Sequence, residues 1–168
     1  SFRKSLLPRG DTFSQLERQA RTCLDSYLSS DLLAREPVAI EESFRIERSV
    51  NGHSVLLKGK VDAVFRGDDG ECIVDFKTSS TIDKKDQEKF ERQLAFYDLL
   101  LRENGHHTTS ALIIQVGDEI VEHPVALNED TRSSLTTCLD EVIEELLSGK
   151  WRQGEPGPYD DLLALLSD

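Results

Sequence analysis

The sequence GKVDAVFRGDDGECIVDFKTS, residues 59–79, decides how this chain folds. It holds two largely apolar runs separated by Gly67-Asp68-Asp69-Gly70, a composition typical of a tight turn. We therefore expect two adjacent strands, with Asp62 near the middle of the first and Asp75 toward the end of the second. Alternation along a strand places Asp75 and Lys77 on one face. If the two strands pair through the turn, Asp62 lies across from Asp75.

Two carboxylates and an ammonium group in an apolar sheet need a reason, because buried unpaired charge is costly. A divalent cation supplies one, since aspartate oxygens suit Mg²⁺ or Mn²⁺. Such a metal acidifies a bound water and stabilises charge on a phosphate oxygen. Lys77 would orient or deprotonate that water, or stabilise the transition state. Spacing alone favours this hydrolytic site about equally with a buried Asp–Lys ion pair that holds no metal.

The rest of the chain supplies the elements around these strands. Helical periodicity or capping predicts three helices, and alternation or apolar runs predict five strands. The helices are expected at 11–30, 83–102 and 128–149, and the strands at 38–47, 53–65, 72–77, 111–116 and 119–127. Asn51-Gly52 is a strong hairpin signal between the first two strands. The order predicts an α/β fold with a mixed sheet flanked by helices.

The helix at 83–102 adds two candidate residues. Gln93 and Tyr97 are four residues apart, so they share one face of the helix. Gln offers hydrogen-bond donors and an acceptor, and Tyr offers a hydroxyl and a ring that can stack. One interpretation has both facing the strand-borne acids. The alternative is ordinary packing of Tyr97 at the core edge with Gln93 in solvent.

Composition limits the class of protein. The 168 residues suit one domain, predicted at 1–150, followed by a Pro/Gly-rich linker and a short apolar helix at 151–168. The net charge of −12 argues against a protein that coats nucleic acid, and predicts weak DNA binding by this domain alone. No apolar run approaches the roughly 18 residues of a membrane helix, and the first residues lack a signal peptide's apolar core. Because the chain starts without Met, we expect a fragment of a longer protein; a processed N-terminus is the alternative.

The three cysteines are Cys23, Cys72 and Cys138, too far apart for zinc or iron–sulfur spacing. We expect no iron–sulfur cluster. Each lies in an apolar helical stripe or strand, which favours buried free thiols in a reducing cytoplasm.

Three short motifs occur in order on successive elements. They are Gly59-Lys60-Val61-Asp62, then Asp75-Phe76-Lys77-Thr78, then Gln93-Leu94-Ala95-Phe96-Tyr97. Each is weak alone, but the ordered set resembles the PD-(D/E)XK nuclease superfamily, and within it the RecB-type nuclease domain. The resemblance covers about residues 38–126. It implies a restriction-endonuclease-like core and phosphodiester hydrolysis that depends on Mg²⁺ or Mn²⁺.

The resemblance also implies roles for individual residues. Asp62, Asp75 and the backbone carbonyl of Phe76 would bind the metal, and Lys77 would be the catalytic lysine. Thr78, Gln93 and Tyr97 would support the site or contact DNA.

A further catalytic glutamate is implied on the strand before Gly59, in a context like E-x-x-F. Glu41-Glu42-Ser43-Phe44 matches, with Glu41 in register. Glu42 falls on the apolar face by alternation, and the choice between the two stays open.

The sequence departs from the RecB-type pattern in two places. It has no helix bearing G-x-x-x-H, whose histidine is a further metal ligand, and Ala63 stands where an arginine often follows the aspartate. Relatives of this type commonly sit C-terminal to UvrD-like helicases in double-strand break repair. The resemblance therefore implies a DNA exonuclease or helicase-coupled endonuclease, with helicase domains in the same chain or in a partner. One alternative is a non-catalytic module of the same fold that mediates protein or DNA interaction within a helicase, favoured by the missing histidine and the acidic charge. The other is a nuclease acting on RNA or another phosphoester.

Overall fold

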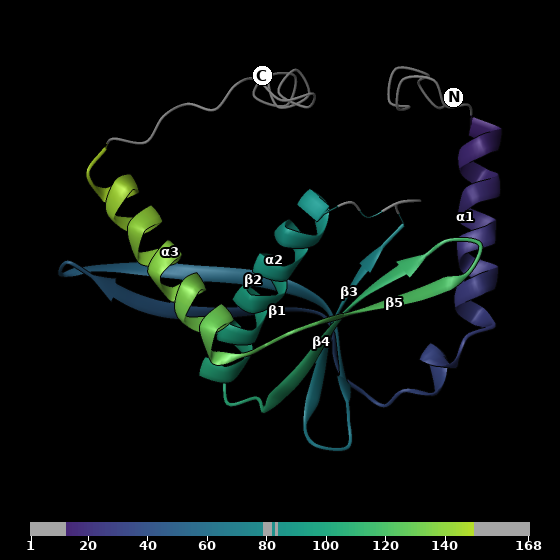
Figure 1. The fold of residues 1–168 in the computed structure, drawn as a ribbon, viewed down its shortest axis with the longest axis horizontal. Coiled ribbons are helices and arrows are strands. Elements are labelled where there is room, and N and C mark those ends of the chain that lie inside the picture. The colour runs from purple at the N-terminus through teal and green to yellow at the C-terminus, as the bar shows by residue number, and fades with distance from the viewer. Residues whose placement is uncertain (1–12, 79–81, 83, 150–168) are drawn as a thin grey trace.

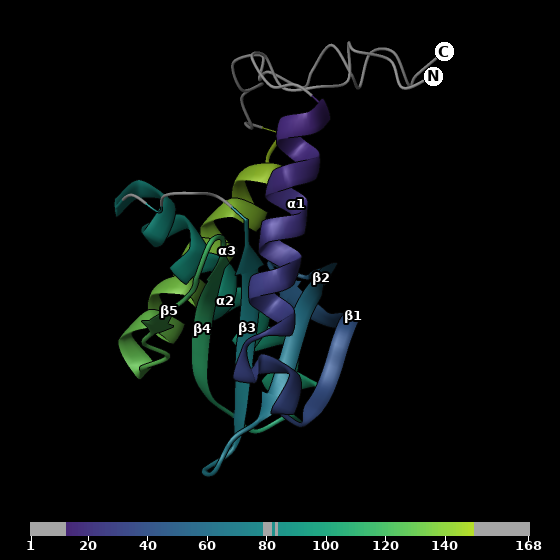
Figure 2. The ribbon, with the colours of Figure 1, turned by 90° about the vertical axis from the view of Figure 1, so that its right-hand side faces the viewer.

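A computed structural model describes residues 13–78, 82 and 84–149 of the chain. One five-stranded sheet has α2 and α3 on one face and α1 on the other (Figures 1 and 2). The elements are α1 (Phe13–Leu28), the short 3-10 helix η2 (Asp31–Ala34), β1 (Pro37–Val50), β2 (His53–Arg66), β3 (Glu71–Lys77), α2 (Lys84–Glu103), β4 (Thr108–Val116), β5 (Ile120–Val125) and α3 (Glu129–Leu147).

The sheet is mixed, and its strands lie side by side in chain order, β1-β2-β3-β4-β5. Neighbouring strands are antiparallel except β3 and β4, which are parallel and joined by the α2 crossover. The predicted α/β class, the mixed sheet and the order of the main elements are therefore confirmed. Asp11 and the tail at 151–168 lie outside the described residues.

β1 and β2 form a long two-stranded arm. Each has 14 residues, so β1 runs beyond the strand predicted at 38–47. The predicted hairpin turn is present: Asn51 and Gly52 have φ angles of 51° and 78°. Two positive φ values in a two-residue loop match the twist of the strands and explain the Asn-Gly pair.

The arm bends at Glu41, a second non-glycine residue with a positive φ, 51°. Glu41 stands opposite Asp62 in the register, between the pairs Ile40↔Ala63 and Glu42↔Val61. Alternation within 38–47 predicts that Val38, Ile40, Phe44 and Ile46 share one buried face. The irregular backbone at Glu41 interrupts this alternation, and the prediction is wrong at Ile40. Its side chain is 53% exposed, and Ala39 is buried instead.

Each face of the sheet packs a separate apolar cluster. On the α2 side, buried side chains of β1–β4 meet the inner face of α2, and on the α1 side a smaller cluster of strand residues meets α1 and η2. Val61 and Ile73 belong to the first cluster, and Ala63, Val74 and Phe76 contact the second. β3 lies between the two, which is why its end is enclosed on both faces.

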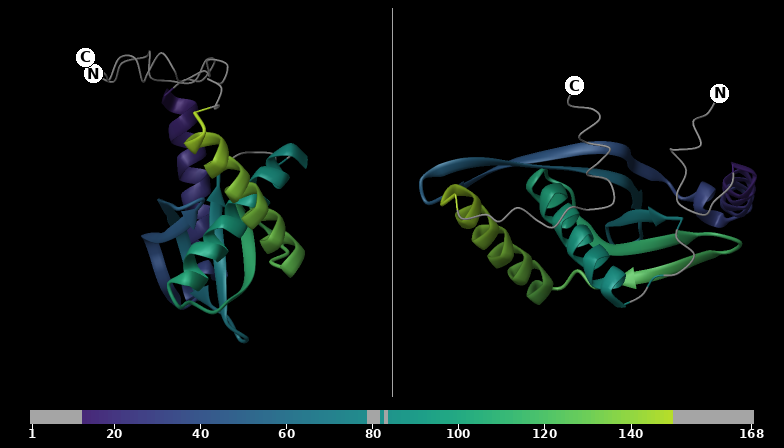
Figure 3. Two further views of the ribbon diagram at one scale, coloured as in Figure 1. Left: turned by 90° about the vertical axis from the view of Figure 1, so that its left-hand side faces the viewer. Right: turned by 90° about the horizontal axis from the view of Figure 1, so that it is seen from above.

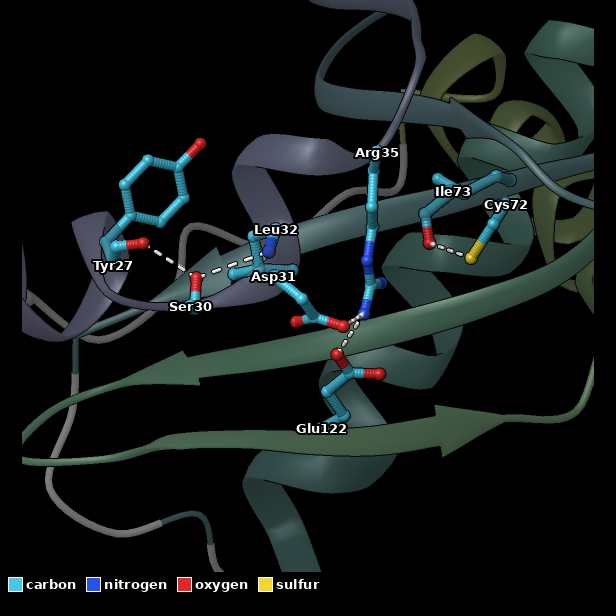
Figure 4. A network of polar contacts seen from close by, with 8 residues as sticks. All are labelled: Tyr27, Ser30, Asp31, Leu32, Arg35, Cys72, Ile73 and Glu122. Atoms are coloured by element: carbon cyan, nitrogen blue, oxygen red, sulfur yellow. Dashed lines mark hydrogen bonds and ion pairs between the residues drawn. The ribbon is translucent and has the colours of Figure 1, made fainter.

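The corner between α1 and β1 is fixed by polar contacts around η2 (Figure 4). Ser30 caps η2: the Leu32 N–H donates to Ser30 Oγ at 3.3 Å, and that hydroxyl donates to the Tyr27 carbonyl at 2.7 Å. Arg35 forms an ion pair with Glu122 on β5. These contacts tie the α1 end of the molecule to the far edge of the sheet.

Polar contacts join α3 to the β1–β2 arm and to α2. Asp98 of α2 is buried at 1% exposure and accepts a 2.8 Å hydrogen bond from Arg132 and a second from Thr108. Helical spacing predicts an apolar stripe of Leu135, Cys138, Leu139, Val142 and Leu146 on this helix. That prediction is largely wrong: Val142 and Leu146 are 46% and 57% exposed, and the buried residue is Ile143.

All three cysteines are free, as expected, but Cys138 is exposed rather than buried. No helix in the described part of the chain is long and apolar enough to cross a membrane.

Candidate active site

The candidate site forms where β2 and β3 separate. Their last paired residues are Ala63 and Val74, so pairing ends one residue before Asp62 and Asp75. Beyond that point β3 stays paired with β4 as far as Lys77. The Phe76 N–H donates to Asp62 Oδ2 at 2.9 Å, and this side-chain contact joins the two strands where the ladder has ended. The opening brings both predicted carboxylates to one place.

Asp75 and Lys77 lie on one face, as alternation predicted. Lys77 Nζ lies 2.5 Å from Asp75 Oδ2, and the Asp75 side chain is only 2% exposed. The ring of Phe90 on α2 supports the ammonium group from the other side, 4.6 Å from Nζ to the ring centroid. Lys77 is thus fixed between a carboxylate and an aromatic face.

Burial raises the pKa of Asp75 above its ordinary value. The charge on Lys77 opposes this shift, and the nearby negative charge of Asp62 adds to it. A like-charge neighbour acting on a buried carboxylate is the electrostatic setting in which a bound cation is favoured.

The α2 pair lies beside this opening rather than in contact with the carboxylates. Gln93 Nε2 donates to the Tyr97 hydroxyl at 2.8 Å. Tyr97 is 9% exposed and belongs to the cluster under α2, which fits the packing interpretation. Gln93 is half-buried rather than solvated, because the tyrosine hydroxyl engages it.

Gly59 allows α2 to approach β2 closely. A Cβ there would lie 2.7 Å from Leu100 Cδ1 and 3.2 Å from both Phe96 Cε1 and Tyr97 Cε1. Real Cβ atoms do not approach other atoms this closely without something moving. The glycine three residues before Asp62 therefore has a packing reason that does not depend on catalysis.

The other expected residues lie at the margin. Glu41 is exposed and forms an ion pair with Lys60, and Glu42 is exposed too. Thr78 is exposed, and its carbonyl accepts from Gln19 Nε2 at 3.5 Å, the long limit of a hydrogen bond. Across residues 13–78, 82 and 84–149, no three His, Cys, Asp or Glu side chains are grouped to hold a metal. The structure thus brings together Asp62, Asp75 and Lys77. Glu41 stands opposite Asp62 in the register, but its side chain pairs with Lys60.

Residues 4–158 match the family model of the PD-(D/E)XK nuclease superfamily. The chain belongs to this superfamily. Its family model therefore covers most of the 168 residues, including the three motifs, the bent arm and α3.

Solved structures with the same fold include relatives of low sequence identity. A candidate exonuclease from Eubacterium rectale superposes with a TM-score of 0.58 at 12% identity, over 93% of this chain and 68% of that one. The protein SSO0001 gives a TM-score of 0.51 at 18% identity, over 86% of this chain and 63% of that one. At such identities the comparison establishes the fold alone. No curated protein is significantly similar to the chain.

The donor set of this PD-(D/E)XK site suits a hard divalent cation. Asp75 Oδ2 is buried, and its one described polar contact is the close ion pair with Lys77. The described contacts engage only one oxygen of Asp62. Two carboxylates and the carbonyl of Phe76 are oxygen ligands of the kind that Mg²⁺ accepts together with water. The residues present therefore fit the divalent metal that the superfamily typically uses.

Two residues near the site escaped the sequence analysis. Helical periodicity places Phe90 on the apolar stripe of α2 and predicts no role for it at the site, although its ring contacts Lys77. Gln19 on α1 reaches Thr78 from 59 residues away in sequence. No local pattern marks a contact of that separation.

Proposed function

We propose that this chain is a metal-dependent deoxyribonuclease domain that hydrolyses phosphodiester bonds, using Mg²⁺ or Mn²⁺ held by Asp62, Asp75 and the Phe76 carbonyl. The observation that carries the proposal is the end of β2–β3 pairing at Ala63↔Val74, with two carboxylates and Lys77 gathered at the opening. Membership of the nuclease superfamily supports the same reaction.

Each residue of the site has a separate role in the proposed reaction. Asp62 is oriented by the Phe76 N–H, and Asp75 is enclosed by the two apolar clusters, so both carboxylates face the opening with little freedom. When bound, the metal supplies an acidified water and stabilises charge on the scissile phosphate. Lys77, fixed by Asp75 and Phe90, donates hydrogen bonds to the attacking water or to a phosphate oxygen. Gln93 and Tyr97 hold the adjoining face of α2, and Thr78 follows Lys77 at the rim.

The test is cleavage of labelled single-stranded and blunt-ended DNA with Mg²⁺ or Mn²⁺. The wild-type protein should cleave, and Asp75→Ala and Lys77→Ala should each reduce the rate by at least about 100-fold. The control is Glu42→Gln, an exposed change on β1 close in sequence to the Glu41 prediction. If Asp75→Ala, in the longest natural form of the protein, cuts at the wild-type rate, the assignment is wrong.

Glu41 needs a test of its own, because its ion pair with Lys60 holds it at the margin of the site. We expect Glu41→Gln to lower the cleavage rate without lowering the melting temperature if Glu41 joins the site when substrate is bound. An unchanged rate would remove Glu41 from the catalytic set.

Calorimetric titration with Mn²⁺ separates a nuclease from a non-catalytic module. A nuclease site predicts saturable binding that disappears in Asp62→Asn. No heat of binding in the wild-type protein would favour the module.

The proposed setting is a DNA repair or recombination helicase–nuclease. This chain spans about two thirds of the length of the two solved relatives. UvrD-like helicase domains, in the same chain or in a partner, would supply affinity for DNA, which a domain with a net charge of −12 has little of by itself. A pull-down from the native source followed by mass spectrometry should recover helicase peptides, or detect them in the same polypeptide. Recovery of the protein with neither would argue against this setting.

A further inference from the structure

One face of the β1–β2 arm carries cations in an otherwise acidic chain. Phe44 and Ile46 point to the α2 side of the arm, so the residue between them, Arg45, points to the opposite face. Lys58 and Lys60 flank Gly59, which touches α2, and therefore also point to that opposite face. All three cationic side chains are exposed. We call Arg45, Lys58 and Lys60 the basic ladder.

Arg45 and Lys58 stand directly opposite each other in the antiparallel register. Like charges in that position repel and destabilise a strand pair. Neither charged group has an ion pair with any acid in the part of the chain that the structure describes. By contrast, Lys60 is neutralised by Glu41, and Arg48, on the helix side of the same arm, is bonded to Asp140 at 2.7 and 2.9 Å. Glu47 is exposed two residues from Arg45 on the same face, but it forms no ion pair with either cation among the described residues. A like-charge pair without an ion-pair partner, in a chain with 32 acidic residues, indicates that the two cations serve something other than folding.

The ladder leads to the candidate site. Lys58 and Lys60 precede Asp62 by four and two residues on β2, and alternate residues of a strand lie about 6.6 Å apart. No described helix covers this face of the arm: α2 and α3 lie on the other side, and α1, on the same side as the ladder, packs beside β4 at the far end of the molecule (Figure 3). The face is therefore open from Arg45 to the point where β2 and β3 separate.

A cavity between α1 and the β4–β5 hairpin is a less suitable place for an anion. It measures about 680 Å³. Its lining includes Arg18 but also Asp118 and Glu119, so its charge repels a phosphate backbone more than it attracts one.

We propose that the basic ladder binds successive phosphates of one nucleic acid strand and guides that strand to Asp62 and Asp75. This rests on the proposed nuclease function and assigns its strand-binding surface. Cations placed on alternate residues of one strand pair follow a single backbone, and contacts to phosphate bind without regard to sequence. In the substrate complex, phosphate takes the place of Glu41 on Lys60 and relieves the repulsion between Arg45 and Lys58.

The experiment compares the wild-type protein with the double variant Arg45→Gln/Lys58→Gln. Binding of a fluorescein-labelled 20-nucleotide single strand is followed by anisotropy in EDTA, between 50 and 200 mM salt. Loss of two phosphate contacts should weaken binding roughly 10- to 30-fold and lower the slope of log K against log salt by about 1.4. The melting temperature should stay the same or rise, because the variant removes a repulsive pair. A merely structural role would lower it.

The matched control is Arg92→Gln/Arg102→Gln, which removes two exposed cations from α2 and gives the same change in net charge. Its affinity should stay within about twofold of wild type. If both variants lose the same affinity, the effect reflects net charge alone and the ladder proposal is wrong. The proposal is also wrong if the Arg45→Gln/Lys58→Gln protein keeps the wild-type affinity and salt slope. No binding by the wild-type protein would overturn it as well.

Two further experiments distinguish DNA from RNA as the ligand, and the ladder proposal from the proposed nuclease function. RNA of the same sequence and blunt duplex DNA are bound in parallel; the ladder predicts similar loss for DNA and RNA single strands and a smaller loss for duplex. Cleavage with Mg²⁺ is measured separately. A protein that binds through the ladder but never cleaves would contradict the nuclease function and leave the ladder standing.

Discussion

Asp75 is the residue whose environment departs furthest from that of an ordinary aspartate. It is 1% exposed, and burial raises its pKa despite the ammonium group of Lys77 beside it. A raised folded-state pKa means that the folded protein holds the proton more tightly than the unfolded chain does. Ionisation of Asp75 therefore lowers the free energy of unfolding as the pH rises. The loss begins near the pKa of the unfolded chain, about 3.9, and is complete above the pKa of the folded protein.

We expect Asp75→Asn to be more stable than the wild-type protein in metal-free buffer at pH 7. An amide keeps the shape of the protonated acid and removes the buried charge; each 1 kcal/mol gained would raise the melting temperature by about 2–4 °C. The advantage should fade as the pH approaches 3.9 and below. Differential scanning calorimetry in EDTA measures it. A lower melting temperature in Asp75→Asn would show that the Lys77 ion pair outweighs burial.

Gly59 is the second residue whose identity the packing dictates. We expect Gly59→Ala to cost about 1–3 kcal/mol, because its Cβ would press on Leu100 and on the rings of α2. Urea denaturation of Gly59→Ala, Leu100→Ala and the double variant tests this reason. The double variant should be more stable than the sum of the single losses predicts, since Leu100→Ala removes the nearest atom. Strict additivity would contradict the close approach.

At the scale of elements, α3 depends on charge to hold its position. Arg48 and Asp140 join the arm to α3 through two hydrogen bonds, and Asn51 donates to Glu144 at 3.0 Å near the tip. Hydrogen bonds from Arg48 lower the pKa of Asp140. A carboxyl whose pKa is lower in the folded state stabilises the fold. This stabilisation is fully present above the pKa of the unfolded chain and is lost as the pH falls through the pKa of the folded protein.

The Arg48–Asp140 pair should therefore give a distinct acid dependence. Wild-type protein should be more stable than Asp140→Asn at pH 6, and the difference should shrink below about pH 4, where the carboxyl of the unfolded chain is protonated. Urea titrations at several pH values measure the difference. Arg48→Gln should remove most of it, so that adding Asp140→Asn to Arg48→Gln has little further effect. A difference that does not change with pH would assign the contact to packing instead.

At the scale of the whole molecule, local patterns predicted the elements and their order, but not how the sheet bends and opens. Alternation placed Asp75 and Lys77 together, and Asn51-Gly52 marked the hairpin. The prediction from alternation was wrong at Ile40 because the next residue, Glu41, has a positive φ. Glycine and asparagine commonly adopt such an angle, but glutamate does not, so the sequence gives no sign of it. The α3 stripe was wrong because Ile143, not Val142 or Leu146, faces inward. On this helix Asp140 and Arg132 form polar contacts with Arg48 and Asp98, and such contacts between distant segments have no periodicity.

The opening between β2 and β3 divides the sheet into two parts joined mainly by four residue pairs, Ala63↔Val74 to Arg66↔Glu71. One part is the β1–β2 arm and the other is β3–β5, with Asp62 and Asp75 on opposite sides of the division. A metal held by both carboxylates would link the two parts and stabilise the folded molecule by mass action, by about 2.7 kcal/mol at 100 times its dissociation constant.

We therefore expect Mn²⁺ to raise the melting temperature of the wild-type protein by several degrees, with a midpoint that depends on metal concentration. Asp62→Asn leaves the β3 side intact and should abolish most of this increase, and Glu42→Gln should preserve it. Hydrogen exchange at Phe76 should slow with Mn²⁺ in the wild-type protein, since its N–H bridges the division through Asp62. An equal rise in Asp62→Asn would place the cation elsewhere and remove Asp62 from the site.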